Sequence, residues 1–492
     1  MPAVWQSLGA AGLMWLLSRR RSDPGRAGRT LWWHASTWLV GATGWLYVSL
    51  HTYGGLPGWL AVLAIVLLCL ALSGYMGLAG WAWARWSTGR AGPDALSFAA
   101  VWLLAELARA EIFTGFPWGA SGYALIDTPM VALAPWLGVY GLGAVWVGLL
   151  AWLVWAWPSR QRGWALGSVA LVWVALGFTG PGRFTHAHGS VLSVSLIQGN
   201  VPQDEKFTPE RQWPVLAWHA QQILAQPGQL IVAPETAFTL LPQQLPEGFW
   251  REFEGDFAAQ PGRVALVGMP LGDEAVGYQN AVVGLVGQVN GQVNGQPGAG
   301  YRYAKHHLVP FGEFIPWGFR WFVDLMNMPL GDFSRGPLVA PSLNVRGQRV
   351  APTICYEDLY GEEIAARFTQ PDQAPTLMVN VSNLAWFGEH VAMDQHLQIA
   401  RMRSLEFQIP TLRATNTGAT VVINEQGRVT DRLPLNTRGV LQATVQGQAG
   451  VTPFAWWAGR LGLWPLWGLG LGLTSLAAWA ARRRSRSASH IH

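Results

Sequence analysis

The stretch Val350-Ala351-Pro352-Thr353-Ile354-Cys355-Tyr356-Glu357 ends an apolar, strand-like run on a thiol, and a carboxylate follows two residues later. Two upstream segments have the same form: Ile231-Val232-Ala233-Pro234-Glu235, and Tyr301-Arg302-Tyr303-Ala304-Lys305. A glutamate, a lysine and a cysteine at strand ends supply a base, a cation and a nucleophile. Acyl transfer through a thiolate needs these three groups. The pattern therefore predicts a sheet-containing domain in which Cys355 is the candidate nucleophile.

The composition of the chain indicates a membrane protein. Half of its 492 residues are hydrophobic and only 12% are charged, whereas soluble domains have about 25% charged residues. The deficit is concentrated in residues 1–180 and 460–481. The net charge of +5 does not indicate a nucleic-acid partner. Many arginines stand beside apolar runs, as in Arg19-Arg20-Arg21 and Arg482-Arg483-Arg484, and this placement is typical of membrane topology.

The cysteines and histidines favour neither a disulfide framework nor a metal site. Cys69 lies inside an apolar run and Cys355 in the polar part of the chain, so we expect no structural pairing between them. His306 and His307 are adjacent, and neighbouring residues of a strand point to opposite faces. We therefore expect neither a metal nor another cofactor.

Seven apolar runs predict membrane spans, at 4–17, 31–50, 57–84, 94–113, 133–157, 164–180 and 463–481. The third run is long enough to contain a break at Ser73-Gly74. Arginines fall in alternate connections, at 18–30, 85–93, 158–163 and after 481, whereas 51–56 and 114–132 contain neither Lys nor Arg. If every run crosses the bilayer, the basic connections are cytoplasmic and the block 182–455 lies on the opposite side. The same alternation places the N-terminus outside, so we expect that one more span precedes Met1.

The polar block between 190 and 447 predicts a domain rich in β-structure. We expect strands at 191–197, 230–233, 264–268, 280–283 and 377–381, helices at 209–226 and 391–407, and a closing pair of strands at 419–424 and 438–445. Many strands with few helices indicate sheets packed together with helices outside. A small repeat at 287–298 predicts a hairpin or loop without catalytic meaning.

These segments resemble a known family. The Glu, Lys and Cys segments resemble the carbon–nitrogen hydrolase (nitrilase) superfamily, whose Glu-Lys-Cys triad lies on an α-β-β-α sandwich. The apolar spans on both sides narrow the resemblance to the apolipoprotein N-acyltransferase family. Further matching motifs lie at 113–118, 308–313, 333–336, 354–357, 385–388, 401–406 and 415–418.

The resemblance implies a polytopic α-helical membrane domain plus an α/β nitrilase-like α-β-β-α sandwich. Residues 1–181 would form the membrane domain, with about six spans, and residues 190–447 the periplasmic catalytic domain. A transmembrane helix at 463–481 and a basic cytoplasmic tail at 482–492 would follow.

The resemblance also assigns site residues. It makes Glu235 the general base, Lys305 the cation that stabilises the oxyanion, and Cys355 the nucleophile. Four further positions match residues that the family needs around the site: Glu313, Tyr356, Glu357 and Trp386.

The implied function is the transfer of the sn-1 acyl chain of a phospholipid, with phosphatidylethanolamine as the expected donor. The chain would pass through a thioester on Cys355 to the α-amino group of the N-terminal diacylglyceryl-cysteine of apolipoproteins, at the bacterial inner membrane. Two alternatives stay open: a membrane-tethered amidase with the same triad, and a catalytically silent membrane scaffold. A transporter is disfavoured because few charged residues fall within the spans.

The chain departs from the family pattern at two points. The family has Asp after the Asn of its Asn-Asp-Ala/Gly-Trp-Phe motif, whereas Leu384 follows Asn383 here, which puts the local loop geometry in question. The family also has seven spans before the catalytic domain, whereas this chain shows six. That difference agrees with the expected span before Met1.

Two further features are interpreted from the residues alone. Glu106 and Arg109 are one helical turn apart, and we favour an interfacial pair over a polar entrance that faces the external domain. The run from 311 to 330 is rich in aromatic residues. We interpret it as a mobile arm that lies on the membrane and admits acyl chains, because aromatic side chains suit the interface.

Overall fold

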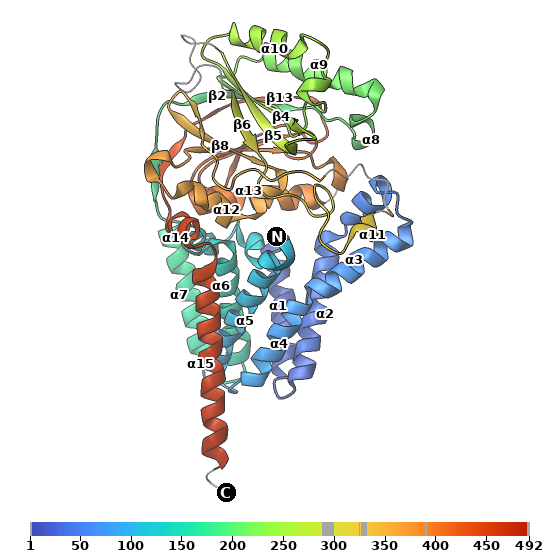
Figure 1. Cartoon of the computed structure of the whole chain (residues 1–492). Coiled ribbons are helices and arrows are strands. Elements are labelled where there is room, and N and C mark those ends of the chain that lie inside the picture. The colour runs from blue at the N-terminus through green and yellow to red at the C-terminus, as the bar shows by residue number, and fades with distance from the viewer. Residues whose placement is uncertain (1, 288–299, 324, 326–331, 389–390, 490–492) are drawn as a thin grey trace. The chain divides into compact units, whose positions relative to one another are not determined.

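The computed structural model describes the whole chain except residues 1, 288–299, 324, 326–331, 389–390 and 490–492. The predicted repeat after Gly287 lies outside the described residues. Contacts divide the chain into two compact units, coloured along the sequence in Figure 1. The helical unit comprises Met1–Gly44, Trp59–Gly182 and Arg460–His492, and the sheet unit comprises Trp45–Gly58 and Arg183–Gly459.

The helical unit is built from the apolar runs. Its helices are α1 (Pro2–Ser18), α2 (Pro24–Thr43), α3 (Gly58–Leu72), α4 (Gly74–Trp86), α5 (Ala91–Glu111), α6 (Ala134–Ala156), α7 (Arg162–Thr179) and α15 (Trp464–Ser489). The predicted break between α3 and α4 falls at Ser73. The start of α2 has a clear local cause, because the Asp23 carboxylate accepts from the Arg26 N–H and Pro24 occupies the first turn.

Several helices of this unit suit a bilayer. Among the described residues, three helical stretches are long and apolar enough to cross it: Gly58–Trp86, Pro129–Ala156 and Arg162–Thr179. The bent pair Pro453–Leu461 and Trp464–Arg484 makes a fourth if it counts as one span. The other predicted spans are also helical, but α1 has 17 residues, and α2 and α5 contain charged residues. The protein is therefore a membrane protein, and its number of spans stays a prediction.

Small residues allow α2 and α4 to pack closely. A Cβ added at Gly28 would lie 2.9 Å from the Gly77 carbonyl oxygen, and one at Gly80 would lie 3.0 Å from the Ala27 carbonyl oxygen. Dispersion contacts replace the hydrophobic effect as the force between helices in lipid, so such close approach stabilises the bundle.

The charged pair on α5 is buried and holds the connection that follows the helix. The Glu106 carboxylate accepts from the Ser121 N–H at 2.7 Å and from the Ser121 hydroxyl at 3.1 Å. The Arg109 guanidinium donates to the carbonyl oxygens of Phe116 at 2.8 Å and Trp118 at 2.6 Å. The expected interfacial pair does not describe these contacts, because both side chains are buried and bond to the segment 116–121.

The sheet unit contains two six-stranded sheets. The first has the order β13-β2-β3-β4-β5-β6 and the second β12-β11-β10-β9-β8-β7, and β1 pairs separately with β14. The neighbours β2-β3-β4 and β8-β9-β10 are parallel, and antiparallel strands flank both sets. The strand bounds are β1 (Thr185–Ala187), β2 (Leu192–Gln198), β3 (Leu230–Val232), β4 (Val264–Asp273), β5 (Gly277–Val286), β6 (Tyr301–Ala304), β7 (Leu343–Val345), β8 (Gln348–Ile354), β9 (Leu377–Ser382), β10 (Thr411–Thr415), β11 (Val421–Ile423), β12 (Val429–Arg432), β13 (Gly439–Val445) and β14 (Gln448–Gly450).

The two sheets pack face to face with helices outside, which gives the four layers of the expected α-β-β-α sandwich. Alternation along the strands sets the layers: Leu196 and Val232 point into the core between the sheets, whereas Ile197 and Ile231 point to the outer layer. Figure 1 shows α9 and α10 beyond one sheet and α12 and α13 beyond the other. The helices of this unit are α8 (Gln203–Lys206), α9 (Pro209–Ala225), α10 (Phe249–Ala258), α11 (Arg320–Val323), α12 (Gly361–Ala365), α13 (Val391–Phe407) and α14 (Pro453–Leu461).

One expectation about the sheets was wrong. The runs at 419–424 and 438–445 do contain strands β11 and β13, but these strands belong to different sheets. β11 pairs with β10 and β12, whereas β13 pairs antiparallel with β2 along its whole length. Strand patterns show which residues are extended, and they do not show which strand lies alongside.

Candidate active site

Cys355 lies at a sharp turn where β8 ends. Its φ of 50° is in the left-handed region that residues other than glycine rarely adopt. The helical turn Cys355–Leu359 starts at once, so the chain reverses around the thiol residue. Such a strained strand-to-helix turn presents a nucleophile at the end of a sheet. Cys355 is 8% exposed, so the residue is buried but keeps a small solvent-accessible area.

Glu235 follows β3, and both of its carboxylate oxygens are held. Oε1 accepts from Asn280 Nδ2 at 2.8 Å, and Oε2 accepts from the Asn383 N–H at 2.8 Å. The backbone here packs against β4, where a Cβ at Gly268 would lie 2.3 Å from the Pro234 carbonyl oxygen. Glycine at 268 is therefore required for the strand to approach this closely.

Lys305 follows β6 and is 1% exposed. Its Nζ lies 2.9 Å from Glu313 and 3.7 Å from Glu235 Oε1. Burial by itself lowers the pKa of the Lys305 ammonium, but the Glu313 and Glu235 carboxylates outweigh burial, and the pKa is raised. Lys305 is thus a permanent cation at neutral pH.

Glu313 is fixed by three donors. Oε1 accepts from Asn280 Nδ2 at 2.7 Å and from Lys305 Nζ at 2.9 Å, and Oε2 accepts from the Val309 N–H at 2.8 Å. Register explains part of this geometry, because Ala281 on β5 pairs with Ala304 on β6. Asn280 and Lys305 are therefore neighbours across the strands, and Asn280 joins the two carboxylates.

These charges act on the Cys355 thiol. Burial raises the pKa of the thiol, the Glu235 carboxylate raises it further, and the Lys305 ammonium opposes both. The thiol is therefore protonated at rest at neutral pH. A nucleophilic reaction then needs a base that removes its proton, and Glu235 is held in this cluster.

The Glu357 carboxylate accepts hydrogen bonds from backbone N–H groups at the ends of β6 and β8. Its carboxylate accepts from the Tyr303 hydroxyl at 2.7 Å, from the His306 N–H at 2.7 Å and from the Ile354 N–H at 2.6 Å. A carboxylate held by so many donors fixes the segments that bear Lys305 and Cys355.

The remaining predicted site residues lie in two neighbouring loops. Tyr356 is buried beside Cys355, and the hydroxyl of Tyr360 donates to its hydroxyl at 3.2 Å. Trp386 belongs to the short turn Ala385–Phe387, three residues after the Asn383 N–H that binds Glu235. Leu384 is fully buried in the apolar core between the sheets, which accounts physically for an apolar residue at this position.

The adjacent histidines have separate partners. His306 Nδ1 lies 2.8 Å from the Gly336 carbonyl oxygen, whereas His307 Nδ1 lies 2.8 Å from Glu363 Oε1. Within the described ranges, no group of three or more His, Cys, Asp or Glu side chains could hold a metal ion.

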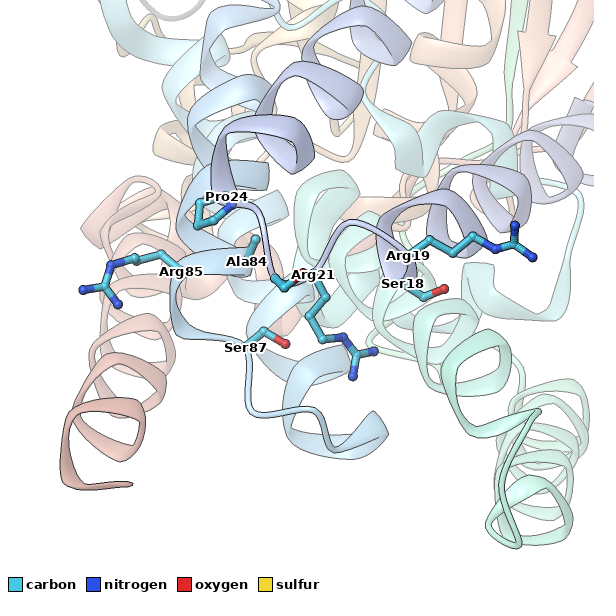
Figure 2. Close-up of a pocket in the computed structure, with 8 residues that line it drawn as sticks. Ser18, Arg19, Arg21, Pro24, Ala84, Arg85 and Ser87 are labelled. Carbon is cyan, nitrogen blue, oxygen red and sulfur yellow. The ribbon is translucent and has the colours of Figure 1, made fainter. Parts of the chain in front are cut away.

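The helical unit has a hollow of its own, of about 630 Å³, at the connections that follow α1 and α4. Figure 2 shows that Arg19, Arg21 and Arg85 diverge from one another around it. They do not converge on one point, so the hollow lacks the geometry of an anion site. It does place the basic connections 18–24 and 84–87 at the same end of the helical unit.

Comparison with known proteins gives the family. A profile described as "Apolipoprotein N-acyltransferase N-terminal domain" matches residues 2–151, and one described as "Carbon-nitrogen hydrolase" matches residues 193–454. An apolipoprotein N-acyltransferase of Verminephrobacter eiseniae is 45% identical over 94% of this chain and 89% of its own length. The chain belongs to the apolipoprotein N-acyltransferase family.

Other relatives agree. The apolipoprotein N-acyltransferase of Ralstonia nicotianae is 46% identical over 92% of this chain and 84% of its own length, and that of Nitrosomonas europaea is 39% identical over 96% and 93%. A solved carbon–nitrogen hydrolase of Helicobacter pylori matches 57% of this chain and 95% of its own, with 15% identity and a TM-score of 0.37. Membership in the family confirms the resemblance, and the two packed sheets confirm the expected fold class.

Proposed function

We propose that this protein transfers the sn-1 acyl chain of a phospholipid to the α-amino group of the N-terminal diacylglyceryl-cysteine of apolipoproteins. The observation that carries the proposal is the buried cluster of Glu235, Lys305 and Glu313, whose charges act on the thiol of Cys355. The apolar helices of the same chain suit a donor and an acceptor that both reside in lipid.

In the first half-reaction Glu235 removes the proton of the Cys355 thiol, and the thiolate attacks the carbonyl carbon of the sn-1 ester. Lys305 stabilises the negative oxygen of the tetrahedral intermediate. The C–O bond to glycerol then breaks, and Glu235 returns the proton to the departing lysophospholipid oxygen. The acyl chain stays on Cys355 as a thioester, so atoms and charge balance.

In the second half-reaction the α-amino group of the lipoprotein attacks the thioester. Only a neutral amine is nucleophilic, so the α-ammonium first releases one proton to water, and Glu235 takes a second proton from the nitrogen as the C–N bond forms. The C–S bond breaks, and the proton held by Glu235 returns to the sulfur. The products are an N-acylated lipoprotein and the free thiol. Storage of the acyl chain on sulfur separates the two lipid substrates in time.

The contacts of Glu313 and Glu235 indicate different roles for the two carboxylates. Glu313 is the closer partner of the Lys305 ammonium, at 2.9 Å, and keeps that cation in place. Glu235 lies 3.7 Å from Lys305 and is held by two neutral amide donors. We therefore assign the proton transfers to Glu235, and we assign Tyr356, Glu357 and Trp386 to its surroundings.

The proposed setting is the bacterial inner membrane, with the sheet unit on the periplasmic side and phosphatidylethanolamine as the donor. The distribution of arginines supports this orientation, since the basic connections 18–24 and 84–87 share one end of the helical unit.

The test uses purified protein in vesicles of phosphatidylethanolamine labelled in its sn-1 chain, with a synthetic diacylated lipopeptide. We expect label on the amino terminus of the lipopeptide, and no label on a matched lipopeptide whose amino group is acetylated. Cys355→Ser is the control enzyme. Hydrolysis of small amides without lipopeptide acylation would favour the tethered amidase, and inertness toward both substrates would favour the silent scaffold.

A further inference from the structure

A buried chain of polar side chains lies behind the nucleophile. The carbonyl oxygen of Cys355 is 3.2 Å from His396 Nε2 and accepts from Asn380 Nδ2 at 3.4 Å. His396 is on α13 and is fully buried. Sequence reasoning did not single out His396, because it lies 41 positions from Cys355 and belongs to no metal or triad pattern.

Arg413 on β10 fixes the tautomer of His396. Arg413 Nη2 lies 2.7 Å from His396 Nδ1, and Arg413 Nη1 donates to the His396 carbonyl oxygen at 3.0 Å. A guanidinium can only donate, so Nδ1 must be the acceptor and the ring proton must be on Nε2. His396 therefore donates an N–H to the Cys355 carbonyl oxygen. Burial and the nearby Arg413 charge lower the pKa of His396 well below its usual value, so the ring stays neutral.

Arg413 is also linked to residues on either side of Cys355. Arg413 Nη1 lies 3.6 Å from Asp358 Oδ2, and the Thr353 hydroxyl donates to Asp358 Oδ1 at 3.1 Å. Thr353 precedes Cys355 by two residues and Asp358 follows it by three. Asp358 thus contacts Arg413 directly, and Thr353 is linked to Arg413 through Asp358. Between them, His396 binds the carbonyl oxygen of Cys355.

We propose that His396 and Arg413 are positioning residues that hold the Cys355 backbone in its left-handed conformation and so aim the thiol. They act through Cys355 and touch no substrate. The inference rests on the proposed function for its acyl-transfer readout. The reason for such a support is physical: a non-glycine residue at a φ of 50° is strained and persists only where the surroundings hold it.

The test compares His396→Phe, which keeps the ring shape without the donor, with His396→Gln, whose side-chain amide can donate to Cys355 and accept from Arg413. We expect His396→Phe to slow single-turnover acylation of Cys355 by about 10- to 100-fold, the cost of a small misplacement of reacting groups. The KM for phospholipid should stay unchanged. His396→Gln should restore most of the rate.

A second readout needs no phospholipid. Alkylation of Cys355 by iodoacetamide, followed across pH, should change its profile in His396→Phe and regain it in His396→Gln. His219→Phe is the matched control, because His219 is an equally buried histidine in the outer helix α9, and its alkylation profile should match wild type.

Two results would overturn the proposal: wild-type acylation and alkylation in folded His396→Phe, or equal loss in both phenylalanine variants without rescue by glutamine. If His396→Phe does not fold, Arg413→Lys takes its place, since lysine lacks the two-pronged guanidinium whose Nη2 contacts the His396 ring while Nη1 lies near Asp358; a wild-type alkylation profile there refutes the idea. An absent acyl adduct in wild type would instead count against the proposed function.

Discussion

Asn280 is the residue on which the two carboxylates of the site depend. Its Nδ2 donates to Glu235 Oε1 at 2.8 Å and to Glu313 Oε1 at 2.7 Å, so one amide separates two like charges. Without it, the Glu235 carboxylate keeps the Asn383 N–H as its remaining neutral donor. The base would then be free to move toward Lys305 and away from the thiol.

Replacement of Asn280 tests this arrangement. Asn280→Ala should lower the acylation rate of Cys355 by about 10- to 100-fold, since hydrogen bonds to charged groups contribute about 1.5–3 kcal/mol. Asn280→Asp should be more harmful, because it adds a third carboxylate to the cluster. Single-turnover acylation by labelled phospholipid measures both rates, and Asn424→Ala on the far loop after β11 is the control. Full activity of Asn280→Asp would refute the bridging role.

Lys206 is a second buried lysine, and it gives a pH prediction. Its Nζ donates to the Glu235 carbonyl oxygen at 3.1 Å, and burial lowers the pKa of Lys206 to about 7. The unfolded chain keeps this ammonium protonated up to about pH 10.4. Between these values the unfolded state binds more protons, so the free energy of unfolding rises with pH, by at most about 1.4 kcal/mol per pH unit.

Lys206→Met removes that titration. The difference in melting temperature between wild type and Lys206→Met should shift in favour of wild type as the pH rises from about 7 to about 9. Thermal unfolding in detergent at several pH values measures it. A constant difference, or one that shifts toward the variant, would show that Lys206 remains charged in the folded protein.

The connection between α2 and α3 is the unexpected element of the sheet unit. Within Trp45–Gly58, Ser49 Oγ donates to the Trp386 carbonyl oxygen at 2.7 Å, and Trp45 Nε1 donates to Gln395 Oε1 at 3.1 Å. The Trp45 ring lies 4.4 Å from the ring of Phe387. This connection therefore packs on the loop whose Asn383 N–H binds the Glu235 carboxylate.

Trp45→Ala should loosen that loop. We expect phospholipid-dependent acylation to fall by about tenfold or more, because the loss of a buried tryptophan costs about 3–5 kcal/mol locally. Ser49→Ala should have a smaller effect in the same direction. Steady-state kinetics in vesicles check this prediction, with Trp59→Ala on α3 as the control. If Trp45→Ala and Trp59→Ala behave alike, the connection has no role at the site.

The aromatic run after Glu313 is a second element with a testable role. Trp317 is 99% exposed and Trp321 is 62% exposed, while Phe311 packs edge-on against Phe319 and Phe322. Such exposed aromatic surface fits the predicted membrane-lying arm. Residues 324 and 326–330 of the run lie outside the described part of the chain.

Replacement of Trp321 and Phe322 by Ser should impair turnover of phospholipid more than acylation of Cys355 by a soluble thioester. The reason is that the soluble donor needs no membrane surface. Parallel rate measurements with the two donors decide the matter. Equal losses with both donors would remove the arm from the mechanism.

The sequence predicts correctly those features that depend on one continuous segment. The helix at 391–407 coincides with α13, and Glu235, Lys305 and Cys355 lie at strand ends as predicted. Sequence reasoning failed where the signal is a pairing. β13 lies beside β2 and not beside β11, and Asn280 meets Lys305 only through the register of β5 and β6. The role of His396 depends on its contact with Arg413, because a guanidinium cannot accept a hydrogen bond and therefore fixes the tautomer of the ring.

At the scale of the whole molecule, the sidedness of the chain is the main prediction. The alternation of arginines predicts that the connection 158–163 and the catalytic block face opposite sides of the membrane. Single cysteines at Gln161 and Gln426, both exposed, should therefore react with a membrane-impermeant maleimide from opposite sides of intact inner-membrane preparations. The background for both should be Cys69→Ser with Cys355→Ser. Labelling of both positions from the same side would contradict the orientation.

The most direct test of acyl transfer through sulfur is the mass of the protein after incubation with phosphatidylethanolamine labelled in the sn-1 chain, without any acceptor. We expect one acyl group on the peptide that contains Cys355, lost on treatment with hydroxylamine and on addition of diacylated lipopeptide. Cys355→Ser should show no thioester of this kind. An unmodified Cys355 in protein that nevertheless acylates lipopeptide would contradict the proposed mechanism.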